Sequence, residues 1–139
     1  MRIEGIFNTT IDVLGKSIDL RARNQNLIAS NVANVETPGY TPRALDFEGE
    51  LQGAIKGHKG AGAATHQRHI PLKGAAGRVQ AVAGTVVETP AKSPGKDGNA
   101  VELESEMSKM VENQVMFNAS VQMLAKKFEG LRTAIREGK

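Results

Sequence analysis

The stretch "LESEMSKMVENQVMFNASVQMLAKKFEGLRTAI", from Leu103 to Ile135, carries the strongest structural pattern in this chain of 139 residues. Apolar residues recur at steps of three and four and fill nine of ten positions of a heptad seam over 33 residues, with Gln114 as the polar exception. The nine are Leu103, Met107, Met110, Phe117, Val121, Leu124, Phe128, Leu131 and Ile135. This spacing is typical of a coiled-coil helix. We therefore expect the C-terminal segment, residues 99–139, to form one helix about 50 Å long.

The charges of this segment agree with a helix in that direction. Acidic residues gather near its start and basic residues near its end, namely Glu102, Glu104 and Glu106, then Lys126, Lys127, Arg132 and Arg136. Both placements complement the helix dipole. Asn99, followed by Glu102, has the form of an N-cap with a reciprocal acid. The acidic set therefore indicates a helix start and not a catalytic group of carboxylates.

The N-terminal segment, residues 1–36, predicts a second long amphipathic helix. Its apolar seam is formed by Ile11, Leu14, Ile18, Ile28, Val32 and Val35, with Phe7 extending it backwards. Arg21 and Gln25 interrupt this seam. Pro38 removes a backbone donor and biases Thr37 away from helical angles, so the helix should end near residues 35–36.

The two seams predict a mainly α fold in which the terminal helices pair as an antiparallel coiled coil within one structural domain. A two-helix pair buries only one side of each helix, and further apolar stripes lie off the seams. These stripes are Val13, Leu20 and Leu27 in the first helix, and Met116 and Met123 in the second. Because the middle of the chain offers no third helix of its own, the extra stripes favour packing against other subunits.

The middle segment, residues 37–98, has a different composition. From residue 53 to residue 98, Gly and Pro make up 12 of 46 residues, and the net charge of this part is +5. We expect a flexible, Gly-rich segment with at most short strands, supplied by valines at positions 79, 82, 86 and 87. Phe47 and Leu51 allow a short turn after Asp46.

Composition excludes several kinds of site. The chain has no Cys, so it has no disulfide, no thiolate ligand and no Cys nucleophile. The sequence lacks the motifs of phosphate-binding loops, nucleophile elbows and zinc proteases. The three histidines lie in "HKGAGAATHQRH" without nearby acids, which argues against a metal site. We expect no enzyme activity, no cofactor and no small-molecule substrate. No apolar run reaches the roughly 20 residues of a membrane span, and the N-terminus lacks the apolar core of a cleaved signal peptide.

Two motifs carry a family resemblance. The first is "ANVETPGY", with Asn31 just before it; the second is "DGNAVELESEM". Their residues of interest are Asn31, Ala33, Asn34, Thr37, Pro38, Gly39 and Tyr40, and then Asp97, Gly98 and Asn99. Together with the C-terminal heptads, they resemble the bacterial flagellar axial proteins, and in particular the proximal-rod branch of the basal body. The stretch "THQRHI" also resembles a short part of that branch's middle region. Hook and distal-rod subunits carry a large β domain where this chain has fewer than sixty residues.

The resemblance implies a structural subunit of the proximal rod. Its terminal helices would polymerise into a tube, the drive shaft that transmits torque from the membrane ring to the hook. The implied partners are other rod subunits, the rod–membrane-ring adaptor, the membrane ring and, during secretion, the type III export gate. The implied location is the periplasm-spanning rod of the basal body, reached without a cleaved signal peptide. In such a tube, the corner at Tyr40 would be an inter-subunit joint.

Some alternatives stay open at the level of the sequence. Phe7 and Ile11 match an export-signal pattern of the family, but they also fit the first turn of the seam. The end "LAKKFEGLRTAIREG" resembles the first proximal-rod protein more than the neighbouring rod subunit, which is the alternative within the family. A second class is a basic coiled-coil adaptor that binds nucleic acid through the middle segment, which salt-dependent binding would reveal.

Overall fold

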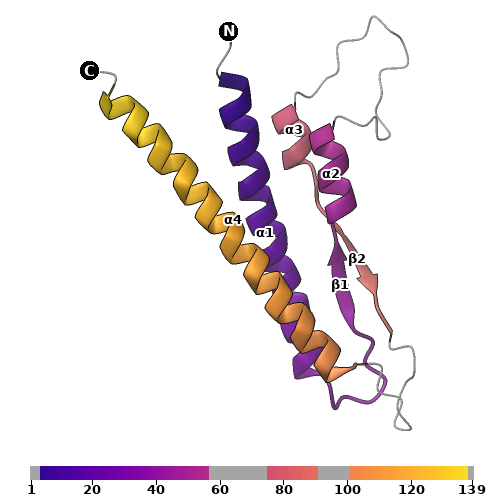
Figure 1. Ribbon diagram of the computed structural model, residues 1–139. Helices are drawn as coiled ribbons and strands as arrows, with labels where there is room; N and C mark the ends of the chain where they lie inside the picture. Colours follow the sequence, from indigo (N-terminus) through magenta and orange to yellow (C-terminus); the bar gives the residue numbers. More distant parts are fainter. Residues whose placement is uncertain (1–3, 57–74, 91–100, 138–139) are drawn as a thin grey trace, which may run out of the picture.

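The computed structural model describes residues 4–56, 75–90 and 101–137. In chain order, the elements are α1 (Glu4–Ala33), β1 (Arg43–Asp46), α2 (Glu48–Lys56), α3 (Ala75–Gln80), β2 (Thr85–Glu88) and α4 (Leu103–Glu137). The two long helices are antiparallel neighbours, as the heptad patterns predict (Figure 1). None of the helices in these ranges is long and apolar enough to cross a membrane.

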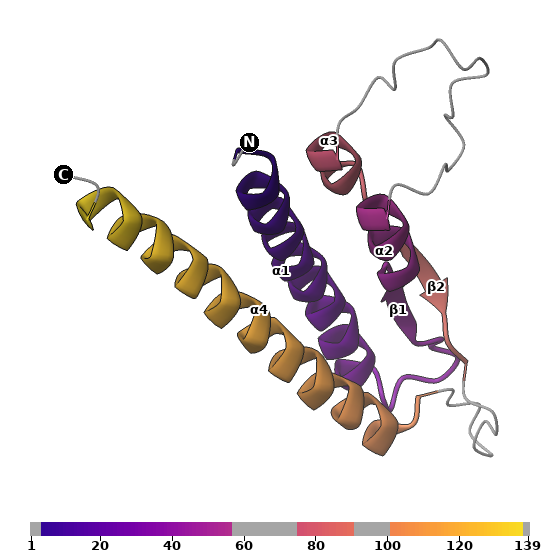
Figure 2. The ribbon, with the colours of Figure 1, turned by 45° about the horizontal axis from the view of Figure 1, so that its top comes forward.

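The α1–α4 pair is closest at one end. The C-terminal half of α1 lies beside the N-terminal half of α4, and the helices diverge toward the N-terminus of α1 and the C-terminus of α4 (Figures 1 and 2). Exposure follows this geometry, since Val101 and Glu106 are buried at the start of α4 whereas Ile135 is 74% exposed near its end. The second half of α4 is therefore exposed over most of its surface.

Helix α1 ends slightly earlier than the sequence predicts. The last helical residue is Ala33, and Asn34 to Glu36 form turns rather than helix. The amides of Asn34 and Val35 bond to carbonyls three residues back, at 3.2 and 3.3 Å. Such tightening satisfies terminal groups at a helix end. Pro38 thus terminates the helix through a tapered turn.

The predicted N-cap of the C-terminal helix is wrong. The amide of Glu106 donates to the carbonyl of Glu102 at 3.0 Å, which makes Glu102 the residue before the first helical turn. Asn99 lies outside the described residues, as do Asp97 and Gly98. Val101 is buried just before α4, so packing of the incoming chain moves the helix start.

The middle segment covers one face of α1, which corrects a second expectation. β1 and β2 pair antiparallel, with Arg43 opposite Glu88 and Asp46 opposite Thr85. This two-stranded sheet and the helices α2 and α3 form a layer beside α1, on the other side from the free end of α4 (Figure 1). The buried cluster between them consists of Leu20, Leu45, Phe47, Leu51, Val79 and Val82, with Val13, Leu27 and Ala54 packed against it.

The stripe at Val13, Leu20 and Leu27 is therefore satisfied within the chain and does not require another subunit. The sequence reading missed this because α2 and α3 are short and Gly-containing, and only tertiary contact stabilises helices of that length. Val79 belongs to α3 rather than to a strand, whereas Val86 and Val87 do lie in β2.

A glycine directly before β2, Gly84, allows the chain to turn from α3 into this strand. Gly84 has a φ of +68° and lies so close to the core that a Cβ there would meet Leu45 side-chain atoms at 3.0 and 3.1 Å and Phe47 at 3.1 Å. Its amide donates to the carboxylate of Glu50 at 3.1 Å. Both the backbone conformation and the available space therefore require glycine.

Part of the predicted flexible segment lies outside the described residues, namely 57–74 and 91–98, and this part includes the three histidines. The remainder of residues 53–98 is ordered as the end of α2, then α3 and β2. The fold is otherwise of the expected class, with two long terminal helices and only a short two-stranded sheet between them.

Candidate functional site

Asn31 is the centre of a buried polar junction between α1, β1 and α4. Its side chain is 1% exposed. The amide nitrogen donates to the carbonyl of Arg43 at 2.8 Å and to Oε2 of Glu106 at 2.7 Å. The amide oxygen accepts from the amide of Arg43 at 2.9 Å and from the hydroxyl of Tyr40 at 3.1 Å. Both donors and both acceptor positions of the Asn31 amide are thus used.

Glu106 brings α4 into this junction. It is 2% exposed, although it belongs to the acidic set that the sequence assigns to a helix start matched to the helix dipole. Its second oxygen, Oε1, accepts from Nζ of Lys109 at 2.6 Å. A buried carboxylate is stable only when it is paired and hydrogen-bonded, and Glu106 has both kinds of partner. Glu102 and Glu104 are exposed, as expected for acids at a helix start.

The residues of the first motif form the turn that closes this junction. The Asn34 side chain donates to the carbonyl of Ser30 at 2.8 Å, and the Thr37 hydroxyl donates to Oδ1 of Asn34 at 3.1 Å. Gly39 has a φ of +75°, a conformation that glycine adopts without strain. This turn directs Tyr40 back to α1. The polar contacts of Tyr40 therefore lie within one chain, and its role between subunits stays a prediction.

Asn24, one heptad before Asn31, supports the same strand. Its Oδ1 accepts from the amide of Leu45 at 3.0 Å. Arg43 and Leu45 alternate with the residues of β1 that face β2, so their main-chain groups point to α1. Two asparagines of α1 thus cover the outer edge of β1, where a further strand would otherwise bond.

Asn113 makes a second polar contact between the long helices. It is 4% exposed, and its amide donates to the carbonyl of Arg21 at 2.9 Å and to Oε1 of Gln25 at 2.8 Å. Arg21 and Gln25 are the residues that interrupt the apolar seam of α1. The residues that interrupt the apolar seam of α1 therefore bond to a polar residue of α4.

The face of α4 that contacts α1 is rotated from the predicted seam. Buried positions on α4 recur every seven residues at Glu106, Asn113 and Ser120, and all three are polar. The predicted positions one residue further on are exposed, namely Met107, Val121, Phe128 and Ile135. Four further positions of the predicted seam, Met110, Phe117, Leu124 and Leu131, are half-buried. One residue corresponds to about 100° around a helix, so half of the predicted seam faces away from α1.

The predicted seam residues of α1 are better covered. Ile28 is buried, and Ile11, Leu14, Ile18 and Val32 are half-buried. Phe7 and Ile11, the candidate export signal, both lie in the first turns of α1. Ala33 is exposed at the helix end, beside the exposed turn residues Thr37 and Pro38.

A groove of about 410 Å³ runs between α4 and the β1–α2 connection, over α1. Arg21, at its floor, forms an ion pair with Glu48 at 3.1 Å and places its guanidinium 5.4 Å from the centre of the Phe47 ring. Within the described ranges, no group of three His, Asp or Glu side chains is placed to hold a metal ion. The arrangement of this site supports the joining of segments and contains no assembled nucleophile and base among the groups described above.

Sequence reasoning missed Glu106, Asn113 and Asn24 as members of the junction. A signal close to Asn113 exists, because the polar break of the predicted seam falls at Gln114, the next residue. Glu106 carries no such signal, since an acid near a helix start has an ordinary explanation in the helix dipole. Only the tertiary contact with Asn31 reveals its role.

Comparison with known proteins agrees with the motif. The family model for the flagella basal body rod protein matches residues 19–41, which span the C-terminal half of α1, the turn and Tyr40. The flagellar basal body rod protein FlgB of Cereibacter sphaeroides is 35% identical over 130 residues, covering 94% of this chain and 96% of the relative. The proteins of the same name from Salmonella typhimurium (strain LT2) and Escherichia coli (strain K12) are each 28% identical over 131 residues, covering 88% of this chain and 90% of each relative. The chain therefore belongs to the FlgB family of flagellar basal body rod proteins.

Proposed function

We propose that this chain is a structural subunit of the proximal rod, and that it polymerises through α1 and α4 into the drive shaft that carries torque from the membrane ring to the hook. The observation that carries the proposal is the apolar stripe on α4 at Met107, Val121, Phe128 and Ile135. These side chains repeat at heptad spacing and are exposed in the single chain, Phe128 by 52%.

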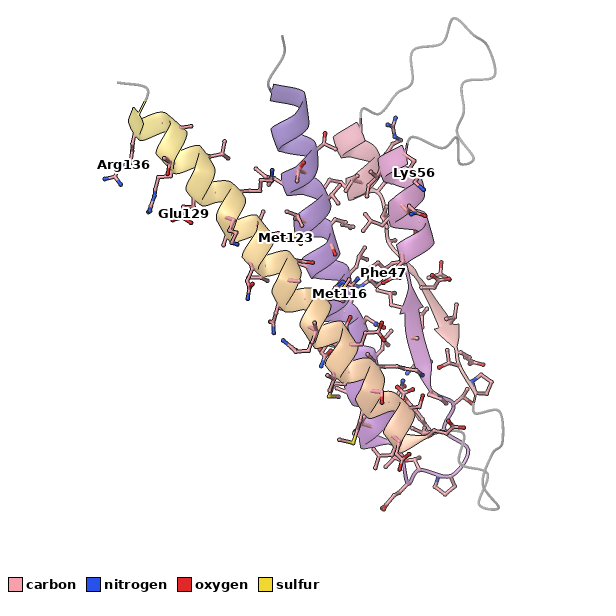
Figure 3. All side chains as sticks on the ribbon, viewed as in Figure 1. Phe47, Lys56, Met116, Met123, Glu129 and Arg136 are labelled. Carbon is pink, nitrogen blue, oxygen red and sulfur yellow. The ribbon has the colours of Figure 1, made fainter. Side chains whose placement is uncertain are left out.

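An exposed apolar stripe of this length is unusual for a monomeric protein and marks an interaction surface. Its period of seven matches a helical partner, because a heptad repeat presents one continuous seam to another helix. Helix α4 diverges from α1 toward its C-terminus (Figure 2), and most residues of its second half are exposed. Glu129 and Arg136 project from the outer side of this half, where they would remain in water (Figure 3).

The proposed mechanism is mechanical rather than catalytic. Torque would pass through many apolar contacts between helices, each weak but large in number. The polar junction at Asn31 would hold α1, β1 and α4 of each subunit together under load. The candidate partners are other rod subunits, the rod–membrane-ring adaptor and the membrane ring.

The proposed route to the rod is the type III export gate, without a cleaved signal peptide. The position of Phe7 and Ile11 in the first turns of α1 is compatible with two roles at different times. They would be recognised in the unfolded chain during export and become part of the helix after assembly.

The replacement Phe128→Asp tests the proposal because it separates assembly from folding. Since Phe128 is exposed in the single chain, a charge there should leave the helical content of the isolated protein unchanged. A charge in the middle of an apolar seam should block polymerisation and abolish swimming. The companion variant Leu124→Asp, at a half-buried position, should also be non-motile.

The matched control is Gln122→Asp, which places the same charge on an exposed position of the same helix, off the seam. We expect the control strain to swim. A swimming Phe128→Asp strain that exports the protein normally would refute the role of this stripe. Images of basal bodies from a strain that lacks the protein should show the membrane ring without a rod.

A further inference from the structure

We propose that Asn31, Glu106 and Asn113 set the register in which α4 pairs with α1 of its own chain, and thereby reserve the apolar stripe of α4 for other contacts. This inference concerns the single chain and holds whether or not the chain polymerises. The three residues are positioning residues, and their contacts join parts of the chain that are 75 to 92 residues apart.

Apolar contacts alone cannot fix this register. The burial of apolar surface is not directional, and both helices carry apolar residues at heptad spacing. Away from Arg21 and Gln25, a slide of one heptad would replace an apolar neighbour by another apolar neighbour at nearly the same place. The seam of α4 at Met110, Phe117, Leu124 and Leu131 is a regular repeat of this kind.

The polar contacts do distinguish one register from another. In the observed register, Glu106 accepts a hydrogen bond from Asn31. Asn113 donates to the main-chain carbonyl of Arg21 and to the side-chain oxygen of Gln25. A slide of seven residues toward the N-terminus of α1 would bring Glu106 to Asn24, another asparagine. It would bring Asn113 to Leu14 and Ile18, which offer no polar side chain. A slide in the other direction would carry Glu106 past Ala33, where α1 ends.

The cost of these alternatives comes from burial. Glu106 and Asn113 are at most 4% exposed. Asn113 in either slide, and Glu106 in the slide past Ala33, would therefore lose a side-chain partner in a place that water does not reach. A buried polar group without a partner costs about 1–3 kcal/mol, and more if it is charged. Buried polar residues are known to specify register in coiled coils at the expense of stability. A polar layer between two otherwise apolar helices fits this use.

The layer also explains why the predicted seam is divided. Polar residues every seven positions direct one face of α4 to α1, and the apolar residues one position further on are left exposed. If α4 paired with α1 through its most apolar face, Met107, Val121 and Phe128 would be buried against α1 of the same chain. The polar layer therefore determines which face of α4 packs within the chain and which face stays exposed to a partner.

The test measures the register directly. The chain has no Cys, so spin labels at Ala29→Cys and Ser108→Cys, both at exposed positions, report a single distance between α1 and α4. In this labelled chain we expect one narrow distance distribution by pulsed electron paramagnetic resonance. The variant Glu106→Leu with Asn113→Leu should broaden the distribution or add a second peak at a longer distance, because a slide of one heptad moves α4 by about 10 Å along α1.

Two controls decide between register and stability. Glu112→Leu with Asn118→Leu changes the same residue types at exposed positions of the same helix and should keep the narrow distribution. Glu106→Gln keeps an oxygen that accepts from Asn31, so this variant should also keep the narrow distance distribution. The proposal is overturned if the double Leu variant retains the narrow distribution, if it loses its helical circular dichroism signal, or if the labelled parent is already broad.

Discussion

At the scale of single residues, Asn31 has the greatest influence on the structure. It is the only residue named above that bonds to α4, to β1 and to the turn at Tyr40 within the described parts of the chain. Each of its bonds is ordinary in geometry, at 2.7 to 3.1 Å. Their value lies in meeting at one buried side chain, and the Glu106 carboxylate, which is 2% exposed, cannot turn to water when Asn31 is removed.

The variant Asn31→Ala should therefore be strongly destabilised. It removes four hydrogen bonds and leaves main-chain groups of Arg43 and the buried carboxylate of Glu106 with fewer partners. We expect the free energy of unfolding to fall by roughly 2–4 kcal/mol, measured by urea denaturation. The control Asn26→Ala, at an exposed position on the same helix, should change it by no more than about 0.5 kcal/mol. Equal effects of the two variants would contradict the central role of Asn31.

Tyr40 allows its two possible roles to be separated. Tyr40→Phe removes only the hydroxyl that bonds to Asn31, so unfolding should become easier by about 1 kcal/mol while motility is kept. Tyr40→Ala also removes the half-exposed ring. If that ring forms an inter-subunit joint, the Ala strain should be non-motile at normal protein levels. A motile Tyr40→Ala strain would limit Tyr40 to its contact within the chain.

At the scale of elements, the layer of β1, β2, α2 and α3 depends on one close approach. Arg23 donates to the carbonyl of Ala83 at 2.7 Å, which holds the turn before β2 against α1. Gly84 then passes next to Leu45 and Phe47 without space for a side chain. Short elements of this size are marginal alone, so this packing determines whether they form.

Gly84→Ala should disrupt this layer. A Cβ at this position would combine a left-handed backbone, which costs roughly 1–2 kcal/mol, with contacts near 3.0 Å to the core. We expect a loss of at least about 2 kcal/mol in thermal or urea unfolding. Gly53→Ala is the matched control, because Gly53 lies inside α2 with free space around it, and the change should stabilise by about 0.5–1 kcal/mol. A tolerated Gly84→Ala would show that this turn can take another path.

At the scale of the whole molecule, the chain has a packed end and a free end. Helix α1 shares buried contacts with the layer of β1, β2, α2 and α3 and with the first half of α4. The second half of α4 is exposed on most sides. Figure 3 shows side chains along this half that extend away from α1. A helix end with so little packed surface has little support beyond its own propensity.

Hydrogen exchange of the isolated chain should record this difference. Amides of residues 106–120 should exchange at least tenfold more slowly than those of residues 124–137, because local opening of the free end breaks few contacts. Assembly into a rod should protect the free end. Uniform protection along α4 in the isolated chain would show that its second half is stabilised without a partner.

Much of this architecture follows from local pattern. Heptad spacing determines the two long helices, and Pro38 with Gly39 determines the turn between α1 and β1, because these effects act over only a few residues. The motif residues from Asn31 to Tyr40 are also evident in the sequence. The short helices α2 and α3 are not, since their formation depends on burial against Leu20 and its neighbours.

What the sequence by itself determined is the set of elements with strong periodicity, and the family to which their motifs belong. The tertiary structure alone decided which face of α4 meets α1. Periodicity ranks faces by apolar content, and by that rule Met107 and Phe128 should be inside. The directional bonds of Glu106 and Asn113 override the rule, because a buried polar group must find its partner while an exposed apolar group costs comparatively little until a partner arrives.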